Sequence, residues 1–180
     1  YKHFMAKEIH EQPTAIASAL GHYLNAERDA VTLPGGIDLA GASRLTLVAC
    51  GTAHYACHVA KYWIEGVARL PVDIEVASEF RYREPPLAPD TIGVFVSQSG
   101  ETADTLAALR HMRAQGCRTL AVVNVATSTI ARESDLALPI LAGPEIGVAS
   151  TKAFTCQLVT LACLAVAAAR ARGAIDAAEE

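Results

Sequence analysis

Five short runs of mainly aliphatic residues recur along the chain, separated by segments with helical spacing or by small polar loops. Runs of this length that are rich in Val, Ile and Leu are typical of strands buried on both faces of a sheet. We therefore expect strands at Arg44 to Cys50, Val72 to Ala77, Ile92 to Ser97, Arg118 to Asn124 and Leu136 to Ile140.

Helical periodicity fills most of the sequence between these runs. After the first run, apolar residues recur on one side of a helix predicted from Ala53 to Leu70, which Pro71 ends. The side chains expected on its buried face are Ala56, Val59, Ala60, Trp63 and Val67. Further helices are predicted at Thr102 to Gly116, Ser128 to Glu133, Ser150 to Arg172, and Tyr1 to Asn25 with a break at Pro13, whereas Leu33 to Gly36 and Arg83 to Pro89 are expected to be loops.

The alternation of strands and helices predicts an α/β fold. Strands joined by helices pair in parallel, with helices on both faces, so we expect a three-layer α/β/α, flavodoxin-like domain with five strands. Ligands of such sheets bind beyond the carboxyl ends of the strands. Three loops fall there: Cys50 to Ala53, Ser97 to Thr102 and Gly143 to Thr151.

The segment Ser97-Gln98-Ser99-Gly100-Glu101-Thr102 carries the clearest chemical signal. It follows a buried strand and opens a helix, so unpaired backbone N–H groups, the positive end of the helix dipole and three hydroxyls gather at one place. A phosphate monoester suits such a turn. The alternative is that Ser99 or Thr102 only caps the helix.

Motifs that are absent narrow the choice of ligand. The first strand lacks a following Gly-x-Gly-x-x-Gly, which argues against a dinucleotide, and no Gly-x-x-x-x-Gly-Lys-Ser/Thr indicates a nucleoside triphosphate. Fifteen basic against nineteen acidic residues give a net charge of −4 without a basic stripe, so nucleic acid is not an expected partner. The longest apolar stretch, Leu158 to Ala169, is shorter than the ~20 residues of a membrane span and predicts a buried helix.

Five cysteines without a Cys-x-x-Cys pair, three of them in apolar surroundings, favour a reducing, cytoplasmic location. His54, Cys57 and His58 share one helical face and are the candidate metal ligands. They have no fourth ligand at a known spacing. A helix that carries two partly exposed histidines is the favoured interpretation.

Longer motifs resemble one family, the glucosamine-6-phosphate synthases, which are glutamine:fructose-6-phosphate amidotransferases. The chain is similar, over almost its whole length, to the first of the two sugar-isomerase (SIS) subdomains in the isomerase half of these enzymes. The motifs are Tyr1 to Met5 with Lys7-Glu8-Ile9 and Glu11-Gln12-Pro13, Cys50-Gly51-Thr52, Ala77 to Arg83, Ser97 to Thr105, and Glu145 to Thr155.

The resemblance implies a set of substrate-binding residues. The serine-rich turn would hold the sugar phosphate, the Cys-Gly-Thr triplet would line the sugar chain, and two residues of the third loop would contact the hydroxyls. The chain departs from the family's frequent Ser at Ala53, where one hydroxyl donor is lost. The implied residues are Cys50, Gly51, Thr52, Ser97, Gln98, Ser99, Thr102, Val148 and Ser150.

The resemblance also implies a reaction and partners. The family makes glucosamine 6-phosphate from fructose 6-phosphate and glutamine, without a metal or organic cofactor. Residues 1–43 are then an N-terminal helical segment and residues 44–180 the first SIS subdomain of a longer enzyme, which also has a second SIS subdomain and a glutaminase domain. A homodimer is expected, with Phe80, Tyr82 and the apolar face of the Ser150 to Arg172 helix as candidate surface.

The catalytic groups that the family uses would lie beyond this chain. Of the acid-base side chains near the three loops, Glu101 is expected in a first helical turn and Glu145 in a loop that it shapes, while Lys152 matches no catalytic position. We therefore expect binding without turnover. A non-catalytic sugar-phosphate sensor of the same fold, and a purely structural module, are the alternatives.

Overall fold

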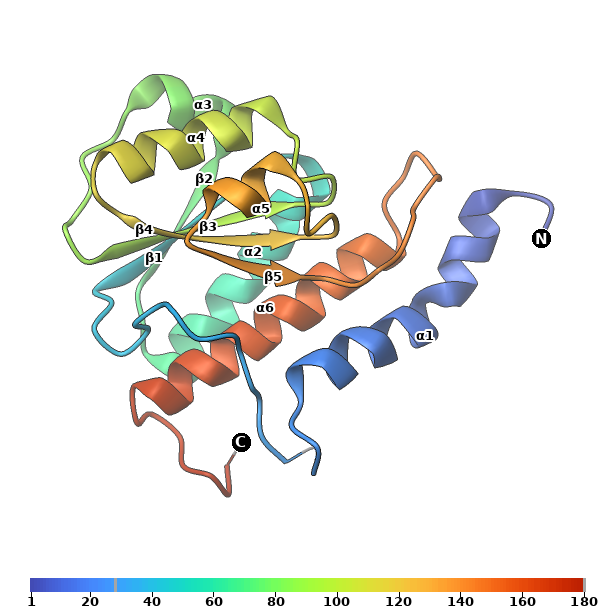
Figure 1. Cartoon of the computed structure of the whole chain (residues 1–180), viewed down its shortest axis with the longest axis horizontal. Coiled ribbons are helices and arrows are strands. Elements are labelled where there is room, and N and C mark those ends of the chain that lie inside the picture. The colour runs from blue at the N-terminus through green and yellow to red at the C-terminus, as the bar shows by residue number, and fades with distance from the viewer. Residues whose placement is uncertain (28, 180) are drawn as a thin grey trace.

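The computed structural model describes residues 1–27 and 29–179, which form a three-layer α/β/α arrangement (Figure 1). A parallel five-stranded sheet in the order β2-β1-β3-β4-β5 makes the middle layer. The strands are β1 (Arg44–Ala49), β2 (Val72–Val76), β3 (Thr91–Ser97), β4 (Arg118–Val123) and β5 (Leu136–Pro139). The helices are α1 (Phe4–Tyr23), α2 (Gly51–Trp63) with the π-helical turn η1 (Ile64–Ala68), α3 (Ala77–Arg83), α4 (Ala103–Ala114), α5 (Thr129–Glu133) and α6 (Lys152–Ala171).

The predicted fold class and all five strands are confirmed, with each boundary within one residue of its predicted position. The three central strands are buried on both faces because helices cover each side. In β3, Val94 and Val96 pack in one core cluster and Phe95 in the other. The edge strands β2 and β5 are only partly buried, so the expectation of burial on both faces is wrong for these two.

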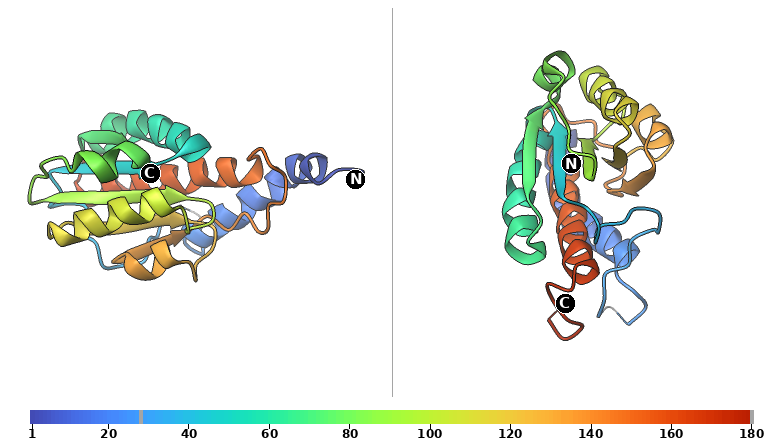
Figure 2. Two further views of the ribbon diagram at one scale, coloured as in Figure 1. Left: turned by 90° about the horizontal axis from the view of Figure 1, so that it is seen from above. Right: turned by 90° about the vertical axis from the view of Figure 1, so that its left-hand side faces the viewer.

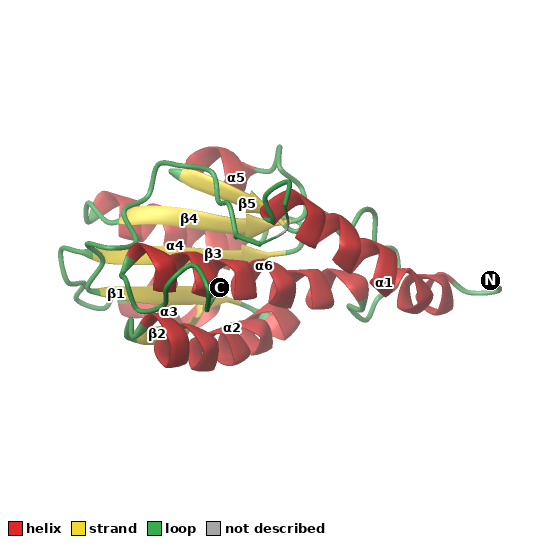
Figure 3. Ribbon diagram, turned by 90° about the horizontal axis from the view of Figure 1, so that it is seen from below, coloured by secondary structure: helices red, strands yellow, loops and turns green. Residues whose placement is uncertain are grey.

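The helices divide between the faces of the sheet. The face covered by α2, η1 and α6 forms the larger core cluster, and α3, α4 and α5 cover the other face (Figure 2). α1 runs alongside α6, toward the β5 side of the sheet (Figure 3). The strand arrows point toward the end of the molecule from which the start of α1 extends, which places the predicted ligand edge near this helix.

α1 runs without a break through Pro13, contrary to the prediction. Proline cannot donate the N–H that the carbonyl of Ile9 would receive in a regular helix. The side-chain amide of Gln12 donates to that carbonyl instead, at 3.0 Å. The neighbouring side chain thus restores the hydrogen bond that proline removes.

The predicted helix from Ala53 to Leu70 begins at Gly51 and ends in the π-helical turn η1. Ala56, Ala60, Ile64 and Ala68 are fully buried, and the last step of this buried face, from Ile64 to Ala68, falls in the π-helical turn. Trp63 and Val67 were expected on this face but are partly exposed.

α3 was not predicted. A strand had been expected to continue through Ala77, and Arg83 had been placed in a loop, but residues 77–83 form a short helix that ends at Glu84 with φ 45°. Seven residues are too few to show a clear helical period. Phe80 is fully buried in this helix, so it is not the exposed surface residue that was expected, whereas Tyr82 is exposed.

α6 has 20 residues and a mean hydropathy of 1.6 over its most apolar window, so its length and composition alone would permit a membrane span. The apolar stretch considered in the sequence, Leu158 to Ala169, is shorter than the ~20 residues of a membrane span. Core helices of globular proteins can have the same length and hydropathy, and α6 packs against α1, α2 and η1. The predicted burial of this helix is confirmed, and its apolar face is therefore not free surface as had been expected.

Candidate functional site

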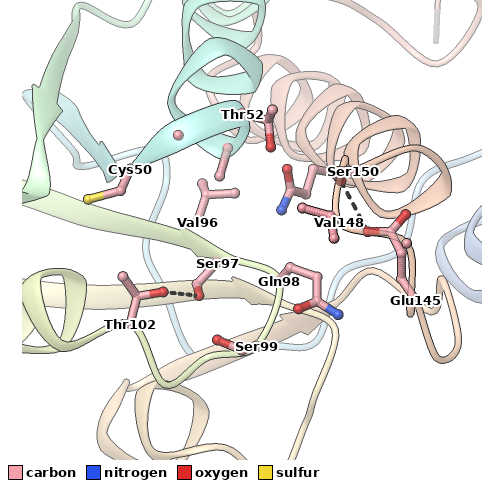
Figure 4. Close-up of a pocket in the computed structure, with 14 residues that line it drawn as sticks. Cys50, Thr52, Val96, Ser97, Gln98, Ser99, Thr102, Glu145, Val148 and Ser150 are labelled. Carbon is pink, nitrogen blue, oxygen red and sulfur yellow. Dashed lines mark hydrogen bonds between the residues drawn. The ribbon is translucent and has the colours of Figure 1, made fainter. Parts of the chain in front are cut away.

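The turn between β3 and α4 is organised by its hydroxyl groups. Ser97, the last residue of β3, is buried, and its Oγ accepts the N–H of Gly100 and lies 3.0 Å from Thr102 Oγ1 (Figure 4). Ser99 Oγ accepts the N–H of Glu101 at 3.2 Å. Thr102 stands at the N-cap position of α4, yet its side chain makes no capping bond. The alternative that Ser99 or Thr102 only caps this helix is therefore wrong.

Gly100 fixes this turn against the neighbouring helix α5. It has φ 67°, and a Cβ at this position would lie 2.0 Å from Ser128 Oγ. Its carbonyl accepts the N–H of Ile130 at 3.0 Å. A residue with a side chain would meet both a strained backbone and a steric clash here, so glycine allows the close approach.

The three predicted loops converge on one pocket of about 370 Å³ at the carboxyl edge of the sheet. Its nine predicted residues come from the start of α2, the turn after β3 and the loop before α6 (Figure 4). All nine line the pocket: Cys50, Gly51, Thr52, Ser97, Gln98, Ser99, Thr102, Val148 and Ser150. The remaining lining residues are Ala53, Val96, Glu145, Gly147 and Gln157.

The hydrogen-bond donors that line the pocket are neutral groups. No Lys or Arg is among its lining residues within the described parts of the chain. α2, α4 and α6 all begin at this edge, and the first N–H groups of a helix have no acceptor within that helix. The N-termini of α2 and α4 therefore offer backbone donors and partial positive charge to an anion, whereas the first N–H groups of α6 bind Glu145.

Glu145 is the only charged residue that lines the pocket in the described structure, and its oxygens are engaged. Oε1 accepts the N–H groups of Thr151 and Ala153 at 2.9 and 3.2 Å, and Oε2 accepts the Ser150 hydroxyl at 3.1 Å. The carboxylate thus caps α6, in addition to the predicted role of shaping the loop.

Glu101 was predicted to lie in the first turn of its own helix and face the helix dipole, but its side chain contacts α5 instead. Its carboxylate accepts the N–H of Thr129 at the start of α5, at 2.7 Å. This hydrogen bond holds the pKa of Glu101 below its usual value. Lys152 is buried and forms an ion pair with Glu11 at 2.7 Å. All three acid-base candidates therefore have structural partners.

Gln157 was missed by sequence reasoning. It lies in the second turn of α6, is 2% exposed and lines the pocket, and its amide oxygen has no hydrogen-bond partner in the structure. The available signal was a long polar side chain inside an apolar helical stretch. A buried acceptor of this kind calls for a donor from water or from a ligand.

The candidate metal ligands do not point toward a common centre. Cys57 points into the core, and burial raises the pKa of its thiol to about 12, whereas His54 and His58 lie side by side with their Nε2 atoms 3.1 Å apart. The described residues hold no group of three metal-ligating side chains. The favoured interpretation, a helix with two histidines at its surface, agrees with this geometry.

All five thiols are free. Four of them are buried: Cys57, Cys117, Cys156 and Cys163. Cys50 is half-buried and lines the pocket.

The fold and the site define a three-layer α/β domain with a small polar pocket at the carboxyl edge of its parallel sheet. The family model described as the SIS domain matches residues 38–167. The chain belongs to the SIS domain family, as its motifs had indicated.

Relatives with assigned names are similar over the whole chain. It is 62% identical over 181 residues to the isomerizing glutamine–fructose-6-phosphate aminotransferase of Brucella abortus, and 60% identical over 182 residues to that of Bradyrhizobium diazoefficiens. These alignments cover the whole of this chain and only 30% of the length of each relative.

The chain is also similar to a solved structure. The C-terminal domain of glucosamine-fructose-6-phosphate aminotransferase from Francisella tularensis superimposes with a TM-score of 0.93 at 43% identity. The match covers 98% of this chain and 50% of the other.

Proposed function

We propose that the chain is the sugar-phosphate-binding part of an isomerizing glutamine–fructose-6-phosphate aminotransferase, which makes glucosamine 6-phosphate from fructose 6-phosphate and glutamine. The observation that carries this proposal is the hydroxyl turn from Ser97 to Thr102 at the N-terminus of α4. The similarity of the whole chain to one part of enzymes of this name supports it.

The pocket suggests how a sugar phosphate lies. We infer that the phosphate binds the hydroxyl turn, where neutral donors are concentrated, and that the sugar chain extends past Cys50, Gly51 and Thr52. Val148 and Ser150 would then lie beside the sugar hydroxyls. The unpaired amide oxygen of Gln157 would accept a hydrogen bond from a hydroxyl group of the sugar.

Binding and catalysis are divided between different parts of the parent enzyme in this proposal. Isomerisation needs a base and groups that handle ring and imine protons, and these contribute ~10²–10⁴-fold each. Glu101, Glu145 and Lys152 are held by structural partners instead. The chain alone is expected to show no conversion between fructose 6-phosphate and glucose 6-phosphate. Turnover that disappears in Glu101→Gln or Glu145→Gln would contradict this.

The proposed partners are the other parts of the enzyme. We propose that residues 44–180 form the first SIS subdomain and residues 1–43 the helical segment before it, with a second SIS subdomain, a glutaminase domain and a second copy of the chain as partners. The match covers 50% of the Francisella domain, which leaves room in that domain for a second subdomain. The location is proposed to be cytoplasmic, which the five free thiols support.

The homodimer has less surface to support it than expected, because Phe80 and most of α6 are buried. Tyr82, Tyr55 and Tyr62 remain as exposed aromatic residues. Light scattering of the chain at high concentration tests self-association, and a monomer at every concentration would contradict it.

A titration followed by amide NMR tests the proposed function. Fructose 6-phosphate and glucosamine 6-phosphate should shift the amides of residues 97–102 and 147–150, and inorganic phosphate should shift the first group alone. An unchanged spectrum with all three compounds would contradict the proposal. A sensor that only binds would bind equally well, so turnover of the full-length protein distinguishes it from the enzyme.

A further inference from the structure

The loop that carries Val148 is held by a carboxylate from the opposite end of the sequence. Glu8 of α1 is 1% exposed, and its two oxygens accept the N–H groups of Ile146 and Gly147 at 2.5 and 3.0 Å. A buried carboxylate needs such donors, and each one it accepts fixes the loop backbone relative to α1.

The contact leaves no room for a side chain on the loop. A Cβ on Gly147 would lie 2.6 Å from Glu8 Oε2 and 3.5 Å from Met5 Cα. The backbone of Gly147 does not have a positive φ, so an alanine would fit its conformation and only the closeness of Glu8 opposes it. Glycine at this position thus serves the approach of α1.

Other contacts hold α1 in place beside this loop. Glu11 pairs with the buried Lys152 at 2.7 Å, and the hydroxyl of Thr155 donates to Gln12 Oε1 at 2.6 Å. At the other end of the helix, the hydroxyl of Tyr23 donates to the carbonyl of Pro139 at 2.7 Å. α1 is therefore docked along its length on α6 and β5, and Glu8 projects from a fixed support.

We propose that Glu8 is a positioning residue for the sugar-phosphate pocket: it holds the backbone at residues 146–147 so that Val148 and Ser150 face the sugar portion of the ligand. This inference rests on the proposed function. Glu8 does not line the pocket, so it acts through the loop. The phosphate-binding turn has its own hydrogen bonds and does not depend on Glu8.

Two variants disturb the contact from its two sides. Glu8→Gln removes the charge and one acceptor, and Gly147→Ala displaces the carboxylate without changing a charge. Glu27→Gln, the same substitution at an exposed residue outside α1, and Gly21→Ala, where nothing lies within 4 Å of the added Cβ, are the matched controls. Each protein is titrated with fructose 6-phosphate and with inorganic phosphate, and hydrogen exchange is measured at the amides of Ile146 and Gly147.

Both test variants should raise the Kd for fructose 6-phosphate by about tenfold, because the apparent Kd rises as the fraction of molecules with an ordered loop falls. The Kd for inorganic phosphate should change by less than about twofold, since that probe needs the turn alone. The amides of residues 146 and 147 should exchange faster in Glu8→Gln. The controls should match the unaltered chain.

The inference is overturned by an equal loss of affinity for both probes, which is what general destabilisation produces, or by unchanged affinity for fructose 6-phosphate. Unchanged amide exchange in Glu8→Gln also overturns it. The exchange is measured without ligand, so it decides the positioning contact even if the unaltered chain binds neither probe, a result that contradicts the proposed function instead. If Glu8→Gln does not fold, Gly147→Ala carries the titration.

Discussion

The hydroxyl oxygens of Ser97 and Thr102 lie 3.0 Å apart, across the turn that joins β3 to α4. Only one of the two can donate to the other, so the pair keeps a hydroxyl hydrogen for a ligand. Because Ser97 is buried and also accepts the N–H of Gly100, it is fixed before any ligand arrives. The turn is thus arranged in advance for an anion, which lowers the ordering cost of binding.

Thr102→Ala should weaken binding of both inorganic phosphate and fructose 6-phosphate. The loss of a hydrogen bond to a charged group costs about 1.5–3 kcal/mol, which is roughly tenfold or more in Kd. Ser99→Ala is expected to act in the same direction. Thr102→Ser keeps the hydroxyl and is the control. Isothermal titration calorimetry measures the effect, and equal affinity of Thr102→Ala and Thr102→Ser would contradict the assigned role.

Gly100→Ala should destabilise the fold more than Gly116→Ala. Both glycines have positive φ, 67° and 80°, so alanine at either position costs about 1–2 kcal/mol in backbone strain. The added Cβ at Gly116 meets nothing within 4 Å, whereas at Gly100 it collides with Ser128. Urea denaturation gives the free energy of unfolding of each variant. Equal losses would show that α5 yields to the new methyl group.

Glu101→Gln should remove a pH-dependent part of the stability. The hydrogen bond from the N–H of Thr129 holds the pKa of Glu101 below its ordinary value of 4.5 in the folded chain. The stabilisation is therefore present above about pH 4.5 and is lost as the pH falls through the lower folded pKa. Denaturation curves between about pH 3 and pH 7 test this.

The unfolding free energies of the unaltered chain and of Glu101→Gln should differ near neutral pH and converge in acid. Glu84→Gln, an exposed change elsewhere, is the matched control. A difference that stays constant with pH would mean that the charge of Glu101 plays no part in holding α5.

Cys50 should be the thiol that reacts first in the folded chain. It is half-buried in the pocket, whereas burial raises the pKa of Cys57 to about 12 and that of Cys156 to about 11. The thiolate is the reactive form, so these buried thiols are inert at neutral pH. Alkylation by iodoacetamide followed by peptide mass spectrometry locates the modified residue, with Cys50→Ser as the control.

Fructose 6-phosphate should slow this alkylation, because the proposed sugar chain passes Cys50. Inorganic phosphate should protect less. If Cys50 is alkylated at the same rate with and without saturating fructose 6-phosphate, the proposed position of the sugar beside the start of α2 is wrong.

The local sequence determined the sheet, the loops at its carboxyl edge and the hydroxyl turn. A buried strand needs a continuous apolar run, and a turn that meets a helix N-terminus needs small polar residues, so both patterns are visible within a few positions. The three loops of the pocket follow from this local pattern, whereas the nine residues within them were named from the resemblance to the family.

Only the tertiary structure decided which parts of the chain meet. The exposure of Trp63, the burial of Phe80 and the unbroken path through Pro13 depend on packing and on neighbouring side chains that periodicity does not report. Glu8 and Gly147 are 139 positions apart, and their contact exists because α1 docks beside α6. Long-range hydrogen bonds of this kind leave no local pattern, since either residue alone is also compatible with an exposed helix or a mobile loop.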